Sequence, residues 1–206
     1  MSTRGKNPYK RPDVFTKQAK AQGYPARSVF KLEEIDRRVR LFRAGQRVLD
    51  LGAAPGSWSM FAAQRIGPKG KLLAVDLTPI TAVLGPTATA VQGDALALDN
   101  ADLALFAPYD VVLSDMAPAT SGSKLADQTR SFELFMRALA VARELLAPGG
   151  AFVGKLFMSD EFPRAKAAIQ ESFDEFRNIR PEGTRSVSSE VFLVGLRRKK
   201  PAPTPP

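Results

Sequence analysis

A run of apolar residues, a glycine-rich turn and the start of a helix follow one another in the stretch Arg47-Val-Leu-Asp-Leu-Gly52-Ala-Ala-Pro-Gly56-Ser-Trp58. This order is typical of parallel α/β sheets, in which the first turn lets the backbone approach a bound nucleotide or nucleoside because glycine has no side chain. An acid about 20 residues after such a turn binds ribose hydroxyls. Asp76 lies at that spacing from Gly56, so the stretch predicts a nucleoside site.

Apolar strand-like segments alternate with helix-like segments on both sides of this stretch. Because the strands of parallel sheets are covered on both faces, we expect an α/β fold of the Rossmann-like, doubly wound type, mostly parallel with helices on both faces. Pro148-Gly149-Gly150 is expected to end the longest helix. The expected strands span residues 47–52, 71–76, 89–94, 109–115, 151–157, 175–179 and 191–196, and the expected helices span 27–40, 57–66, 127–146 and 161–172.

Polar or glycine-rich features follow five of these strands, at the ends where such sheets bind ligands. They are the turn with Gly52 and Gly56, followed along the chain by Asp76, Asp94, Asp115 and Lys155. Asp115 and Lys155 lie within or at the end of apolar strands, where an unpaired charge is costly. We therefore expect these two residues to be paired or functional.

The spacing of the turn bears on which cofactor it binds. Gly52-x-x-x-Gly56 lacks the third glycine of the dinucleotide fingerprint and contains Pro55, with bulky Trp58 close behind. A nucleoside without a pyrophosphate needs less phosphate binding at the helix end, and S-adenosylmethionine is the common ligand of that type. S-adenosylmethionine is therefore favoured, with a dinucleotide or a purely structural turn as alternatives.

The composition excludes several kinds of chemistry. With 206 residues, 44% of them hydrophobic, the chain suits one domain with a substantial core. It has no cysteine and no histidine, which excludes disulfides, thiol nucleophiles, Ser-His-Asp catalysis and the usual metal ligands. Acid–base chemistry therefore falls to lysine, aspartate, glutamate or tyrosine, and no metal is expected.

The net charge of +9 is concentrated near the start of the chain. Residues 1–47 hold 13 Lys/Arg against 4 Asp/Glu, whereas the rest hold 17 of each. Such a segment is typical of nucleic-acid binding, with an anionic lipid surface as the second candidate and a solvated tail as the alternative to both. We expect a flexible basic arm over 1–22, one domain over 23–198 and a disordered proline-rich tail over 199–206, in a cytoplasmic protein without a membrane span.

Several motifs together resemble the FtsJ (RrmJ) family of ribosomal RNA ribose 2'-O-methyltransferases, over roughly residues 24–198. They are Phe30-Lys31-Leu-Glu-Glu-Ile35, Asp50-Leu-Gly-Ala-Ala-Pro-Gly-Ser-Trp58, Ser114-Asp-Met-Ala-Pro118, Pro148-Gly-Gly-Ala-Phe-Val-Gly-Lys155 and Ser188-Ser-Glu-Val-Phe192. The resemblance implies an S-adenosylmethionine-dependent methyltransferase fold with a catalytic tetrad of Lys31, Asp115, Lys155 and Glu190. It also implies a cofactor site formed by Gly52, Gly56, Trp58, Asp76, Asp94 and Asp115.

The same resemblance implies an activity and a substrate. The activity is methylation of a ribose 2'-hydroxyl, and the implied target is a uridine of the A-loop of 23S rRNA in the large ribosomal subunit. Lys155 is the candidate base, and Asp115 and Glu190 are expected to orient its amino group. A monomer is expected. A tRNA anticodon-loop methyltransferase and a non-catalytic RNA-binding ribosome-assembly factor on the same fold are the alternatives.

Overall fold

The computed structural model describes residues 14–182, 184 and 188–200. The helices are α1 (Val14–Ala21), α2 (Val29–Val39), α3 (Ser57–Ile66), α4 (Lys124–Leu145) and α5 (Phe162–Ser172), with a short 3-10 helix η1 at Asp102–Ala104. The strands are β1 (Arg47–Leu51), β2 (Lys71–Asp76), β3 (Ala88–Gln92), β4 (Tyr109–Ser114), β5 (Leu146–Phe157), β6 (Phe173–Ile179) and β7 (Glu190–Arg198).

The strands form one sheet in the order β3-β2-β1-β4-β5-β7-β6. All pairs from β3 through β5 are parallel, whereas β7 runs antiparallel to both β5 and β6. The strand order reverses between β1 and β4, the place where such sheets bind ligands beyond the carboxyl ends of their strands. Because β7 is antiparallel, its first residue, Glu190, reaches this same edge and lies opposite Phe157 of β5.

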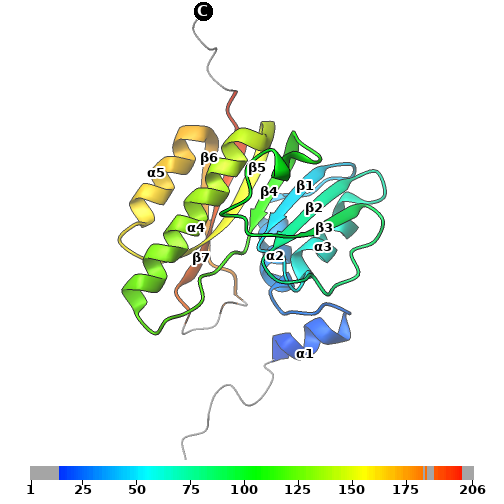
Figure 1. The fold of residues 1–206 in the computed structure, drawn as a ribbon, viewed down its shortest axis with the longest axis horizontal. Coiled ribbons are helices and arrows are strands. Elements are labelled where there is room, and N and C mark those ends of the chain that lie inside the picture. Colours follow the sequence, from blue (N-terminus) through cyan, green and yellow to red (C-terminus); the bar gives the residue numbers. More distant parts are fainter. Residues whose placement is uncertain (1–13, 183, 185–187, 201–206) are drawn as a thin grey trace, which may run out of the picture.

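Helices cover both faces of the sheet, with α4 in front of it and α2 and α3 on the far side in Figure 1. On one face, Phe135 of α4 and Ile169 of α5 pack into the core with apolar residues of the strands. On the other face, Ile35 of α2 and Phe61 of α3 do the same. The α/β, doubly wound, mostly parallel architecture predicted from the sequence is therefore confirmed.

The longest helix starts and ends earlier than predicted. α4 begins three residues before Asp127 because Ser123 caps it, its side-chain oxygen accepting a hydrogen bond from a backbone N–H in the first turn. The helix ends where Leu146 adopts extended backbone and pairs with Tyr109 of β4. Contrary to the prediction, Pro148-Gly149-Gly150 does not end the helix and lies within β5, beside a shift in the β4–β5 register.

The segment expected to be a flexible arm over residues 1–22 is partly ordered. Its last part forms α1, in which Ala19 is only 1% exposed. Phe15 of α1 packs against Phe30 of α2, with ring centroids 5.9 Å apart. Residues 14–21 are therefore helical and packed against α2, contrary to the expected flexibility, and residues 1–13 and 201–206 lie outside the described residues. Among the described residues, no helix has the length and apolar character needed to cross a membrane.

Candidate active site

A cavity of about 310 Å³ opens beyond the carboxyl ends of the central strands. Four residues predicted to bind a cofactor, in separate turns along the chain, come together in its wall. The lining residues are Gly52, Ala54, Val75, Asp76, Leu77, Gly93, Asp94, Ala95, Leu96, Asp115, Met116, Ala117 and Leu134. The position matches the edge at which α/β sheets bind ligands.

The turn after β1 packs closely against the chain that follows β4. Gly52 has φ of +75°, and a Cβ atom there would lie 2.7 Å from Cγ of Met116. Across the turn, Asp76 accepts a hydrogen bond from the Ala54 N–H at 2.9 Å. Its other carboxylate oxygen accepts from the backbone and side chain of Thr78 at 2.8 and 2.9 Å. These bonds fix the Asp76 carboxylate in the cavity wall.

The far end of the cavity combines one carboxylate with apolar side chains. Asp94 follows β3, and its carboxylate accepts a hydrogen bond from the Leu96 N–H at 2.8 Å. Val75, Leu77 and Leu134 add apolar surface to the lining. Leu134 lies on α4, far along the chain from every quoted motif, so no sequence signal could have identified it.

Gly56 and Trp58, the two other residues predicted to bind the cofactor, do not line the cavity. Gly56 has φ of +112°, and a Cβ atom there would lie 2.4 Å from Cβ of Ala82. Glycine is therefore needed at this position for packing against the loop after β2. Trp58 is 2% exposed, and its indole N–H donates to the carbonyl of Ser28 at 2.8 Å.

Lys155 and Asp115 form a buried ion pair beside the cavity. The Lys155 side chain is 7% exposed, and its Nζ lies 2.9 Å from Oδ1 of Asp115. The same ammonium group donates to the Asp115 carbonyl at 2.5 Å. The Asp115 N–H in turn donates to the backbone carbonyl of Leu51 in β1 at 3.2 Å. Because Asp115 also lines the cavity, it connects the lysine to the cavity wall.

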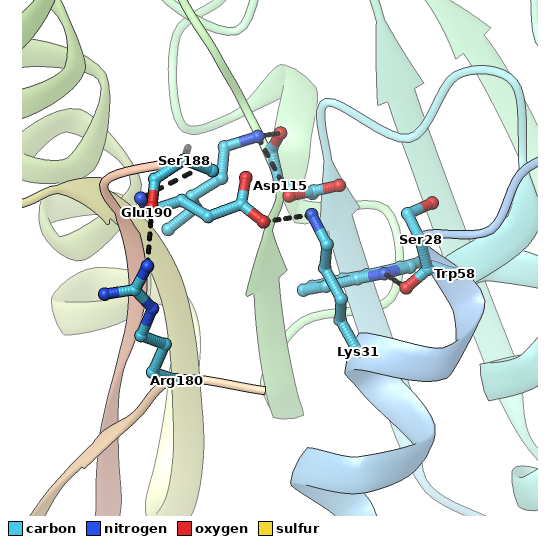
Figure 2. A network of polar contacts seen from close by, with 8 residues as sticks. Ser28, Lys31, Trp58, Asp115, Arg180, Ser188 and Glu190 are labelled. Atoms are coloured by element: carbon cyan, nitrogen blue, oxygen red, sulfur yellow. Dashed lines mark hydrogen bonds and ion pairs between the residues drawn. The ribbon is translucent and has the colours of Figure 1, made fainter. Parts of the chain in front are cut away.

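Lys31 and Glu190 form the second ion pair. They come from α2 and β7 and point toward one another, with Asp115 nearby (Figure 2), and their side chains are 11% and 13% exposed. In the β5–β7 register Lys155 lies opposite Phe192, two residues after Glu190, so Lys155 and Glu190 project from the same face of neighbouring strands. All four residues of the predicted tetrad are therefore brought together as two ion pairs.

One buried carboxylate had no role assigned from the sequence. Asp50, at the end of β1, is fully buried, and Ser59 Oγ donates to its Oδ2 at 2.6 Å. Burial raises the pKa of Asp50 to about 7; the Ser59 hydrogen bond opposes this, while the Asp115 and Asp76 carboxylates add to it. The sequence does carry a signal for Asp50, because it is a charged residue inside an otherwise apolar strand. The same signal led to the expectation that Asp115 and Lys155 are paired or functional.

The lining of the cavity fits S-adenosylmethionine. Carboxylates at Asp76, Asp94 and Asp115 can accept hydrogen bonds from hydroxyl and amino groups and can face a positive charge. The apolar residues between them suit the adenine ring, and the absence of a side chain at Gly52 keeps the turn close to the next loop. Backbone and acids together thus offer the contacts that a nucleoside with a sulfonium and an ammonium group needs.

Solved structures share this fold. A structure from Plasmodium falciparum has a TM-score of 0.74 at 22% identity, covering 85% of this chain and 98% of that chain. Fibrillarin from Aeropyrum pernix, in complex with S-adenosyl-L-methionine, has a TM-score of 0.56 at 17% identity, covering 75% and 67%. The chain therefore shares its α/β fold with both of these structures.

Sequence comparison identifies the family. The chain belongs to the FtsJ-like methyltransferases, whose family model matches residues 24–198. The ribosomal RNA large subunit methyltransferase E of Sorangium cellulosum (strain So ce56) is 76% identical over 199 residues, which cover 97% of this chain and 94% of that protein. The protein of the same name from Bdellovibrio bacteriovorus is 45% identical over 195 residues, covering 93% and 99%.

Proposed function

We propose that this protein transfers a methyl group from S-adenosylmethionine to the ribose 2'-hydroxyl of a uridine in the A-loop of 23S rRNA, within the large ribosomal subunit. The observation that supports this proposal most is the buried Lys155 side chain, which is hydrogen-bonded to Asp115. Asp115 also lines the cavity. The substrate class is supported by relatives named as ribosomal RNA large subunit methyltransferases.

The proposed chemistry needs a base, because a ribose hydroxyl is a weak nucleophile and must lose its proton. The chain has no histidine and no cysteine, so a lysine, a carboxylate or a tyrosine takes that proton. In this proposal Lys155 first releases a proton to solvent and then accepts the hydroxyl proton as the free amine, and the Asp115 carboxylate orients the amine by accepting a hydrogen bond from it. S-adenosylmethionine, when bound, supplies the methyl group.

The remaining site residues bind and orient. Asp76 accepts hydrogen bonds from ribose hydroxyls of the cofactor, and Asp94 binds its adenine end. Glu190 holds Lys31 on the same side of the sheet as Lys155, so that two lysines face the acceptor RNA. Gly52 lets the backbone approach the cofactor closely.

RNA binding is proposed to be mainly electrostatic. The first 47 residues carry the whole excess of positive charge. Arg37 is exposed on α2, the helix that carries Lys31, and Arg40 is exposed at the end of that helix. Such arginines bind phosphates without reading sequence, so recognition of the target uridine falls to the rim of the site. We propose that the protein acts as a monomer in the cytoplasm.

The proposal is tested by transfer of labelled methyl to unmodified large subunits, free 23S rRNA and bulk tRNA, followed by nucleoside analysis. Lys155→Met keeps most of the side-chain volume and removes the base, and we expect a loss in kcat of about 100-fold or more. Lys166→Ala removes a lysine from α5 on the opposite face and serves as the matched control.

The outcomes separate the alternatives. Label in 2'-O-methyluridine of the large subunit, lost in Lys155→Met and kept in Lys166→Ala, supports the proposal. Label only in tRNA contradicts the substrate while keeping the chemistry. Binding of RNA and cofactor without any transfer contradicts the enzymatic proposal and favours an assembly factor.

A further inference from the structure

The indole of Trp58 is directed at the start of the helix that carries Lys31. Its Nε1 donates to the Ser28 carbonyl at 2.8 Å, and the same carbonyl accepts the backbone N–H of Lys31 at 3.0 Å. Figure 2 shows Trp58 and Ser28 beside the Lys31 side chain. One carbonyl oxygen therefore joins the indole to the backbone of Lys31.

Ser57, the residue before Trp58, makes a second bond to the same segment. Its Oγ accepts the backbone N–H of Ala26 at 2.8 Å, and Ser57 is 1% exposed. Ser28 is the N-cap residue of α2 but forms no side-chain capping hydrogen bond. The chain at the amino end of α2 is thus held to the first turn of α3 by two partly buried hydrogen bonds instead of a side-chain cap of its own.

The indole ring of Trp58 also packs against β7, the strand that carries Glu190. The Trp58 and Phe192 rings lie 5.5 Å apart between centroids, and Phe192 is fully buried. Lys31 Nζ lies 5.9 Å from the centroid of the Phe192 ring. Phe192 is two residues after Glu190 and lies opposite Lys155 in the β5–β7 register. The two aromatic rings therefore adjoin both residues of the Lys31–Glu190 pair.

We propose that the side chain of Trp58, together with that of Ser57, has a positioning role: it aligns Lys31 with Glu190 through the Ser28 carbonyl and the Phe192 ring. The inference rests on the proposed function and deepens it. It links the glycine-rich turn, which ends two residues before Trp58, to the second ion pair of the site.

The first test compares Trp58→Phe with the wild-type protein. Phenylalanine retains a ring against Phe192 and loses the indole N–H. We expect kcat to fall about tenfold, while the Kd for S-adenosylhomocysteine, measured by calorimetry, stays within about twofold. Tyr109→Phe is the matched control, because it also removes one buried side-chain bond to a carbonyl, that of Leu103 at 2.7 Å, but at the opposite edge of the sheet. Its kcat should not change.

The second test does not depend on activity. The rate at which an amine-reactive reagent labels Lys31, followed by mass spectrometry with Lys166 as internal reference, reports how firmly Glu190 holds the ammonium group. We expect this rate to rise several-fold in Trp58→Phe and in Ser57→Ala, and to stay unchanged in Tyr109→Phe. Ser57→Ala removes only one oxygen and keeps the test available if Trp58→Phe does not fold.

Two results would overturn the inference. The first is an unchanged Lys31 labelling rate in both Trp58→Phe and Ser57→Ala. The second is a weakened affinity for S-adenosylhomocysteine that accounts for the whole loss of activity in Trp58→Phe, because Trp58 would then act on the cofactor. A wild-type protein that transfers no methyl group would instead contradict the proposed function, while the labelling rates would still decide the role of Trp58.

Discussion

Replacing Asp50 by asparagine should remove a pH dependence from the stability of the protein. Asp50 is fully buried, and its Oδ1 has no hydrogen-bond partner among the residues that the structure describes. Burial raises the pKa of this carboxyl from 3.8 to about 7. Asparagine has nearly the same shape and carries no charge at any pH. The two proteins therefore differ in one titrating group and in little else.

The sign and size follow from linkage. Between pH 4 and pH 7 the folded protein holds a proton on Asp50 that the unfolded chain has released, so this group's contribution to stability falls as the pH rises. At pH 5.5 the folded-state pKa of about 7 lies roughly 1.5 units above the pH, which corresponds to about 2 kcal/mol. At pH 8 that contribution is lost. No histidine is present to titrate in this window.

The measurement is urea unfolding at pH 5.5 and pH 8, followed by the fluorescence of Trp58, the single tryptophan. The difference in unfolding free energy between Asp50→Asn and wild type should shift by about 2 kcal/mol in favour of the variant from pH 5.5 to pH 8. Asp160→Asn, at an exposed position, should show no such shift. Parallel pH profiles for wild type and Asp50→Asn would refute the reasoning.

Three further outcomes are expected. Gly52→Ala should weaken the binding of S-adenosylhomocysteine, measured by calorimetry, more than Gly67→Ala does. Both glycines have positive φ, but only at Gly52 would a Cβ atom collide with Met116, so equal losses of affinity would show that backbone strain alone weakens binding. Hydrogen bonds from Ser121 lower the pKa of Asp127, so its contribution to stability is present at neutral pH and falls as the pH drops from the unfolded-state pKa through the lower folded-state pKa. Asp127→Asn should therefore destabilise less in urea at pH 3 than at pH 7, and an equal loss at both would contradict this. RNA affinity in filter binding should fall about tenfold or more from 50 to 200 mM salt, and a flat response would contradict phosphate binding.

Local patterns were sufficient to predict most elements of the sheet. The apolar run that ends at Asp76 and the helix that starts at Ser57 have the predicted limits, because each is bounded by a glycine or an acid that the periodicity makes visible. The start of α4 was missed although Ser123 is a good N-cap residue. Its end was predicted to within one residue, but the Pro-Gly-Gly sequence lies in β5 because pairing of Leu146 with β4 outweighs its turn preference.

The sequence could predict which residues belong to the candidate site, but not how their side chains are oriented or paired. Strand order alone brings Asp76, Asp94 and Asp115 to one edge, and the structure places all three in one cavity. Spacing could not tell which way the indole of Trp58 turns, since a residue in the first turn of a helix can face either the ligand or the core. The pairing of Lys31 with Glu190 was likewise outside the reach of local patterns, because it depends on contacts between α2 and a strand more than a hundred residues later.

Among the residues that the structure describes, the strand that carries Glu190 is the last along the chain, and it lies inside the sheet, between β5 and β6. The cavity, in contrast, is lined by residues 52–134. A chain emerging from the ribosome thus has every lining residue of the cavity long before the partner of Lys31 exists. Insertion of β7 at the end of synthesis also covers the open edge of β5. This strand therefore both joins β6 to the rest of the sheet and brings in the last member of the proposed tetrad.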